Sequence, residues 1–214
     1  MTLVVFDFDG TLSESDLTVL LGQEYDVENE VQGLVDQSRT GEAAFADTLR
    51  QRIALLDGMP EERVEAAFER AKLRDGVADL LAALNRSDVT TAIVTGGIED
   101  GVRAALDRAG VGVDHLVANR LVVENGAVAG VEGPLLERGK DAVLEELVAT
   151  ADIDPSRTVA VGNDATDLPM LRLAGTAIGF EPEPLVEEAC DVVVTSVRKL
   201  RLYFEQHGVI ETGG

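Results

Sequence analysis

The sequence predicts an α/β protein with a Rossmann-like three-layer core, in which a mostly parallel sheet lies between helices, and with a small helical cap inserted after the first strand. Short apolar runs typical of buried strands stand at 3–6, 90–94 and 158–161, and apolar residues at helical spacing separate them. Between the first two runs, residues 13–72 show helical spacing only. The chain therefore divides into a core domain of residues 1–12 and 73–214 and a cap domain of residues 13–72.

Composition excludes several classes of partner. The 214 residues suffice to bury a sizeable core. Forty acidic residues against eighteen basic ones give a net charge of −22, which repels nucleic acid and anionic membranes. No stretch of eighteen apolar residues and no basic-then-apolar leader is present, so we expect a cytoplasmic protein. The single Cys190 excludes an internal disulfide and fits a reducing compartment.

The excess of acid has two readings. It provides solubility, or it adapts the chain to a cytosol of very high salt. At molar salt the Debye length falls to about 3 Å, so surface carboxylates no longer repel one another but still hold water. We favour this halophilic reading.

The first strand ends in two carboxylates, Asp7 and Asp9, which alternation along the chain places on one face. Ligands of open α/β sheets bind at the carboxyl ends of the strands. Two like charges this close share a proton or bind a cation such as Mg²⁺. In the alternative, both aspartates only cap the next element and Gly10-Thr11 forms an ordinary turn.

The inserted segment is expected to be helical, with breaks at Gly41, Gly58 and Pro60. Its apolar residues recur at helical spacing in four stretches, near 17–21, 27–34, 43–56 and 64–71. A lid at this place in the chain would exclude water and select the substrate.

A helix over 75–85 precedes the second strand, which ends in Thr95-Gly96-Gly97 before a helix over 98–109. A hydroxyl followed by two glycines that open a helix forms a phosphate cradle from one side chain and free backbone N–H groups. Any strand-to-helix turn can carry such residues, so this segment gains weight only from its position after Asp7 and Asp9.

Residues 121–128 predict a hairpin with Asn125-Gly126 in a type I′ turn. Lys140 then precedes a helix over 141–148, and it is one of only three lysines. A lysine is most often a solvated surface residue. Here we favour a second role, in which one ammonium group neutralises a phosphoryl group and a nucleophile together.

The third strand, 158–161, is followed by oxygen donors at Asn163, Asp164 and Asp167. Beside Asp7 they can complete a Mg²⁺ shell, although Asn163 and Asp164 could instead cap the next helix. Short strands at 177–178 and 192–194, with helices near 185 and over 197–204, complete the alternating pattern. His115 and His207 have no partners at ligand spacing and are expected to be structural.

These motifs in order resemble the four motifs of the haloacid dehalogenase superfamily, beginning with Asp7-Phe8-Asp9-Gly10-Thr11-Leu12. Within it, the chain is similar to the phosphoserine phosphatase family over nearly its whole length. The matching segments are Thr95, Lys140, residues 163–167, Phe45 and Arg52 within 41–52, and residues 118–121, 131–133 and 167–170.

The resemblance implies Mg²⁺-dependent hydrolysis of a small phosphomonoester through an aspartyl-phosphate. Asp7 would attack phosphorus, and Asp9 would protonate the leaving oxygen and then activate water. The transferring oxygens would be bound by Thr95, Lys140 and the amides of Gly96 and Gly97.

The resemblance also implies the remaining ligands. Mg²⁺ would be held by Asp7, by the backbone carbonyl of Asp9 and by the fourth motif. Arg52 would pair with the substrate carboxylate, Phe45 would shield the site, and Thr166 would be among the substrate-binding residues. The substrate would be L-phosphoserine, in the last step of serine synthesis.

Three positions depart from the family pattern. Thr95 replaces the usual serine and keeps the hydroxyl. Asp16 stands where a glutamate usually contacts the substrate amine, and it is shorter by one methylene. Asn163 stands at a metal-binding aspartate, so we expect Asp164 or Asp167 to compensate, with Asp164 in or near the inner shell.

Two alternatives remain open at this point. The substrate could be phosphoglycolate or another small phosphorylated acid. Or the chain could bind a phosphate ligand as a regulatory protein that has lost turnover through Asn163. The sequence predicts no oligomeric state.

Overall fold

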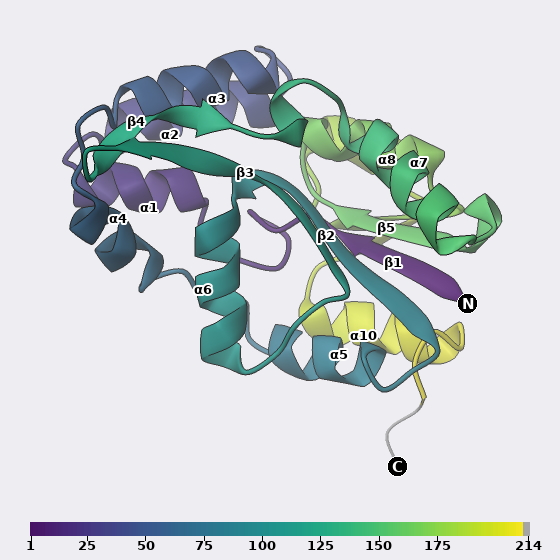
Figure 1. The fold of residues 1–214 in the computed structure, drawn as a ribbon. Coiled ribbons are helices and arrows are strands. Elements are labelled where there is room, and N and C mark those ends of the chain that lie inside the picture. Colours follow the sequence, from purple (N-terminus) through teal and green to yellow (C-terminus); the bar gives the residue numbers. More distant parts are fainter. Residues whose placement is uncertain (212–214) are drawn as a thin grey trace.

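The computed structural model describes residues 1–211. In this part of the chain, seven strands form one sheet in the order β4-β3-β2-β1-β5-β6-β7 (Figure 1). Only the β3–β4 pair is antiparallel, so the prediction of a mostly parallel α/β sheet is confirmed. The strands are β1 (Thr2–Phe6), β2 (Val89–Ile98), β3 (His115–Glu124), β4 (Ala127–Glu132), β5 (Thr158–Gly162), β6 (Thr176–Phe180) and β7 (Val192–Val194).

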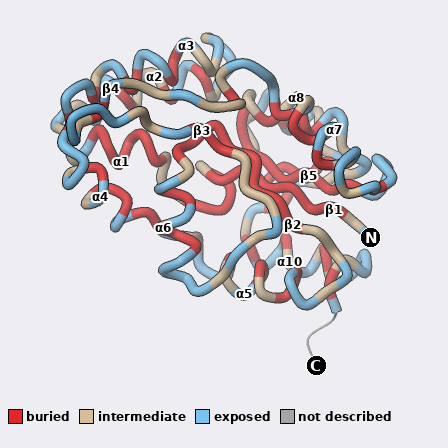
Figure 2. The backbone as a smooth tube through the Cα atoms, in the orientation of Figure 1, coloured by how far each residue is buried: buried red, intermediate tan, exposed pale blue. Residues whose placement is uncertain are grey.

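Helices cover both faces of this sheet. Val4 and Phe6 of β1 belong to a core cluster with α5, α6 and α10, whereas Leu3 and Val5 belong to a cluster with α7 and α8. This division follows from the alternation of side chains along a strand. Figure 2 shows β1 and β5 buried between these layers. The core helices are α5 (Val77–Leu84), α6 (Glu99–Ala109), α7 (Lys140–Ala151), α8 (Leu168–Leu173), α9 (Pro184–Glu187) and α10 (Val197–Gln206), with short 3₁₀ turns η1 (Pro134–Leu136), η2 (Pro155–Arg157) and η3 (Ala165–Asp167).

The segment between β1 and α5 is helical, as expected. It contains α1 (Leu17–Glu24), α2 (Glu28–Arg39), α3 (Phe45–Ala54) and α4 (Glu61–Phe68), which lie together at one end of the sheet (Figure 1). A bridge between Ser13 and Leu73 brings the two ends of the segment side by side.

The β3–β4 hairpin packs on this helical segment. Val128 donates its amide to the carbonyl of Met59 at 2.9 Å and accepts the amide of Gly58 at 2.8 Å. Asn125 and Gly126 have φ of 54° and 79°, which confirms the type I′ turn. The hairpin therefore connects the edge of the sheet to the helical segment.

Two boundaries differ from the prediction. β2 does not end at Val94 but continues to Ile98, because Ile98 pairs with Asn119 after a shift in register, so α6 begins at Glu99. β3 begins at His115 and runs parallel to β2 before it turns into the hairpin. Strand pairing sets both limits. In the described residues no helix combines the length and the apolar character that crossing a membrane requires.

Candidate active site

The site begins at the end of β1. Asp7 continues the alternation of Leu3 and Val5 and therefore lies on the face covered by α7. Lys140 is the first residue of α7, and its Nζ donates to Asp7 Oδ1 and Asp167 Oδ1 at 2.6 Å each. All three side chains are buried, with at most 5% of each exposed. Three residues spaced over 160 positions thus form one ionic cluster.

The pKa values of Asp7 and Lys140 in this cluster are both raised. Burial and the neighbouring Asp167 raise the pKa of Asp7 to about 7, although Lys140 opposes the shift. Burial alone would lower the pKa of Lys140, but Asp167 and Asp7 outweigh it and the pKa is raised, so the group stays an ammonium. The nucleophile candidate is therefore held beside a permanent cation.

Asp9 lies between the first residue of α1 and the end of β2. Its Oδ1 accepts the backbone N–H of Leu17 at 3.1 Å, and its Oδ2 lies so close to Gly97 that a Cβ there would overlap it. Burial, together with the charges of Asp16 and Asp7, raises the pKa of Asp9 well above its usual value. A carboxyl group whose pKa is raised in this way suits a general acid.

The second motif differs in detail from the predicted cradle. Because β2 runs through Gly96 and Gly97, these glycines do not open α6. The Gly97 N–H instead donates to Thr95 Oγ1 at 3.0 Å. A Cβ on Gly96 would overlap the ring of Phe45, so this position requires glycine for close packing.

Asn119 of β3 supports the second motif, a contact that the sequence did not predict. Its Nδ2 donates to the Gly96 carbonyl at 2.9 Å and its Oδ1 accepts the Leu135 N–H at 3.1 Å. The side chain is fully buried. The resemblance over 118–121 marked this segment but gave Asn119 no role.

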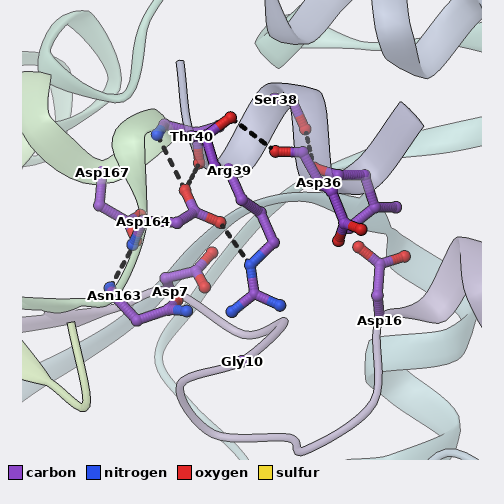
Figure 3. Close-up of polar contacts among 12 residues, drawn as sticks. Asp7, Gly10, Asp16, Asp36, Ser38, Arg39, Thr40, Asn163, Asp164 and Asp167 are labelled. Atoms are coloured by element: carbon purple, nitrogen blue, oxygen red, sulfur yellow. Dashed lines mark hydrogen bonds and ion pairs between the residues drawn. The ribbon is translucent and has the colours of Figure 1, made fainter. Parts of the chain in front are cut away.

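The fourth motif forms a compact loop after β5 (Figure 3). Asp167 Oδ2 accepts the N–H groups of Asn163 and Asp164 at 2.8 and 3.2 Å, and its other oxygen takes Lys140. Asn163 Oδ1 accepts the Thr11 hydroxyl at 3.0 Å. Asp167 is therefore engaged at both oxygens, and Asn163 ties this loop to the first motif.

Asp164 has one free oxygen. Its Oδ1 accepts the N–H and hydroxyl of Thr166 at 2.8 and 2.7 Å. No hydrogen bond of the described residues reaches its Oδ2, which lies 3.8 Å from Arg39 Nε. Burial and the Asp167 charge raise the pKa of Asp164 to about 6.

The donor set fits a hard divalent cation. In the described residues no group of three or more His, Cys, Asp or Glu side chains forms a ready metal centre. However, Asp7 Oδ2 and Asp164 Oδ2 take part in no hydrogen bond with another described residue, and both carboxyls have a raised pKa. Burial therefore leaves these two anions undercompensated, and oxygen donors of this kind suit Mg²⁺.

The cap supplies an arginine and a carboxylate. Buried Arg52 of α3 donates to the Thr18 hydroxyl at 3.2 Å and to Thr48, and its Nη1 lies 3.7 Å from Asp16 Oδ2. Asp16 also caps α1, because its Oδ1 accepts the Thr18 N–H at 2.7 Å. Phe45 lies against Arg52, with 5.4 Å from the guanidinium carbon to the ring centroid.

Two cavities meet at Phe45. The inner one measures only about 30 Å³ and the outer one about 390 Å³. The inner chamber is therefore much the narrower of the two. The inner chamber is lined by all of the predicted groups that would meet a substrate: Asp7, Asp9, Asp16, Phe45, Arg52, Thr95, Gly96, Gly97, Lys140, Asp164 and Thr166.

Comparisons with known proteins identify the family of the chain. The family model described as haloacid dehalogenase-like hydrolase matches residues 4–172. The chain belongs to this family. The resemblance predicted from the four motifs is thus confirmed, and with it the hydrolase fold.

Relatives within the family share a further name. A phosphoserine phosphatase of Halobacterium salinarum is 44% identical over 98% of this chain and 100% of its own length. One of Methanocaldococcus jannaschii is 34% identical over 90% of this chain and 91% of its own length. A substrate-bound phosphoserine phosphatase structure is 31% identical, with a TM-score of 0.89 and coverage of 94% and 97% of the two chains. A structure of a phospho-aspartyl intermediate analogue of phosphoserine phosphatase is 32% identical, with a TM-score of 0.89 and coverage of 94% and 98%.

Proposed function

We propose that the chain is a Mg²⁺-dependent phosphoserine phosphatase, which hydrolyses L-phosphoserine to L-serine and phosphate in the last step of serine synthesis. The observation that carries the proposal is the buried ammonium of Lys140 between Asp7 and Asp167. Without such a cation, a carboxylate could not approach a phosphate dianion. The names of the relatives at 44% and 34% identity support the substrate.

In the first step, an Asp7 oxygen attacks phosphorus and the bond from phosphorus to the serine oxygen breaks. Asp9 gives its proton to that oxygen, a role that its raised pKa favours. Lys140 and the Thr95 hydroxyl stabilise the charge of the transferring oxygens. The products of this step are L-serine and a phosphoryl group on Asp7.

In the second step, the Asp9 carboxylate takes a proton from a water molecule, whose oxygen attacks phosphorus and releases Asp7. Phosphate leaves and Asp9 has regained its proton. The cap residues that line the narrow inner chamber would limit the access of bulk water, which favours this controlled hydrolysis.

The cation would be held by Asp7, Asp164 and the backbone carbonyl of Asp9, with Asn163 as a neutral neighbour. Bound Mg²⁺ supplies positive charge that lowers the repulsion between the phosphoryl oxygens and Asp7. Asp164 would carry the charge that Asn163 lacks, and Asp167 would position the loop rather than serve as the main ligand.

The Arg52–Asp16 pair would select a substrate that bears both an anion and a cation. A guanidinium presents a planar fork that matches a carboxylate, and Asp16 offers an anion to an ammonium group. L-phosphoserine carries both groups on one carbon. Phosphoglycolate lacks the amine and would offer no ammonium group to Asp16.

The proposed enzyme would work in a cytoplasm of high salt concentration. Its net charge of −22 suits such a solution, because salt screens the repulsion between surface carboxylates. Its substrate there would be a small phosphorylated metabolite.

The test is a substrate panel in concentrated KCl with Mg²⁺. We expect L-phosphoserine to give the highest kcat/KM, ahead of its amine-free analogue and phosphoglycolate. Asp16→Asn keeps the helix cap, since asparagine caps as well as aspartate, but removes the charge. It should lower kcat/KM for L-phosphoserine far more than for the amine-free analogue. Absence of phosphate release from every monoester would refute the proposal.

A further inference from the structure

The cap directs a second arginine at the reaction centre, and the chemistry above does not use it. Arg39 is the last residue of α2, and its side chain lines the inner chamber with Asp7, Asp9 and Lys140. Figure 3 shows the guanidinium extending from α2 toward Asp7 and Gly10. Its Nη2 lies 3.2 Å from the place that a Cβ on Gly10 would occupy.

We propose that Arg39 binds the phosphoryl oxyanion of the substrate and of the phosphate product. This role rests on the proposed function, and it makes Arg39 a cap-borne phosphate ligand in addition to the core groups. The cap would then sense both ends of the substrate, with Arg52 at the carboxylate and Arg39 at the phosphoryl group.

The donors of Arg39 are available. No side-chain hydrogen bond of the described residues involves its guanidinium, and Nε is buried without an acceptor within hydrogen-bond distance. The nearest anion, Asp164 Oδ2, lies 3.8 Å away, which orients the group but does not satisfy it. A buried donor without an acceptor is unfavourable, so this arrangement favours an anionic ligand that brings acceptors with it.

The other cations of the chamber are engaged. Lys140 donates to two carboxylates, and Arg52 donates to Thr18 and Thr48. Of the three cationic side chains that line the inner chamber, Arg39 alone has no hydrogen bond in the described part of the chain. A phosphate dianion entering beside several aspartates needs such an uncommitted positive charge.

The chemistry of the guanidinium fits this ligand. Its planar fork can donate to two oxygens of a phosphoryl group at once, whereas an ammonium acts as a point charge. Arg39 is carried by α2, which packs against the η3 turn of the fourth-motif loop, so the role puts a phosphate-binding group on the cap rather than on the core. If Arg39 only linked the cap to the core through Asp164, its replacement would leave the affinity for phosphate unchanged.

Inorganic phosphate is the probe for the test. Its affinity is measured by calorimetry in concentrated KCl for wild type, Arg39→Met and Arg39→Lys, with Arg50→Met as control. Arg50 is on the same cap and is 54% exposed, and its one ion pair among the described residues is with Asp47. We expect about 10- to 100-fold weaker phosphate binding for Arg39→Met, an intermediate loss for Arg39→Lys and no change for Arg50→Met. Guanidinium ions at low concentration should restore part of the affinity of Arg39→Ala.

Two results would overturn the inference. One is wild-type phosphate affinity in both Arg39→Met and Arg39→Lys, and the other is a change in Mg²⁺ affinity alone, which would make Arg39 a competitor of the cation. Circular dichroism checks that each variant is folded. If Arg39→Met does not fold, the phosphate affinity of Arg39→Lys decides the test. Because phosphate binding needs no turnover, a wild-type protein inactive on L-phosphoserine would refute the proposed function but not this role.

Discussion

Replacing Lys140 with methionine should lower the free energy of unfolding, because two buried carboxylates lose their cation. Within residues 1–211, the ammonium alone donates to both Asp7 Oδ1 and Asp167 Oδ1, and these carboxylates are 5% and 0% exposed. Removing one partner of a buried ion pair costs about 3–5 kcal/mol of stability, because the charges that remain are uncompensated. Methionine keeps the apolar stem, so packing loss contributes little.

The loss should depend on pH with a definite sign. Burial already raises the pKa of Asp7 from 3.8 to about 7 with the lysine present, and it should rise further without it. The folded state then keeps a proton that the unfolded chain has released, so stability falls as pH increases between the two pKa values. Wild type shares this loss up to about pH 7, so the deficit of Lys140→Met should be smaller at pH 4 than at pH 8 and should grow as the pH rises above about 7.

Urea unfolding followed by circular dichroism, in concentrated KCl without Mg²⁺, measures this deficit. Arg138→Met is the matched control, since Arg138 is 40% exposed and pairs with Glu146 on the surface. It should change stability by less than about 1 kcal/mol. A deficit for Lys140→Met that is equal at both pH values would contradict the proposed coupling.

Three further changes have clear expected outcomes. Asn163→Asp adds a carboxylate beside Asp164 and should tighten Mg²⁺ binding measured by calorimetry, because it adds negative charge beside the cation, where Asn163 is neutral; an unchanged affinity would remove the support for Asn163 as a neighbour of the cation for which Asp164 compensates. Gly96→Ala places a Cβ in the Phe45 ring and should cost about 1–3 kcal/mol in thermal unfolding as well as activity, with Phe45→Leu restoring part of the stability. Raising KCl should increase both Tm and activity, because screening relieves repulsion among the forty acidic residues. Equal Tm values in dilute buffer and in concentrated KCl would argue against adaptation to salt.

Much of the site could be predicted because it lies where buried strands end. Asp7 and the Asn163 loop each follow an uninterrupted apolar run, and β1 and β5 are neighbours in the sheet. Parallel strands bring such ends to one edge, so sequence order alone indicates that the groups meet. The scarcity of lysine singled out Lys140 in the same way.

Other features depend on tertiary pairing that leaves no local pattern. The extension of β2 through Gly96 is set by β3, whose first half, from His115, mixes polar and apolar residues. Asn119 and Arg39 were not predicted for a related reason. From the sequence alone, a polar residue in a strand and an arginine at a helix end are both expected to face solvent. Only the tertiary structure shows which element packs against them.

The central claim is that Asp7 becomes phosphorylated during turnover. Wild type and Asp7→Asn are mixed with L-phosphoserine and Mg²⁺, quenched in acid within one turnover, digested and analysed by mass spectrometry. The account predicts a phosphoryl group on the peptide that contains Asp7 in wild type and none in Asp7→Asn. Phosphate released by wild type with no phosphoryl group on that peptide, or with the group on another residue, would contradict it.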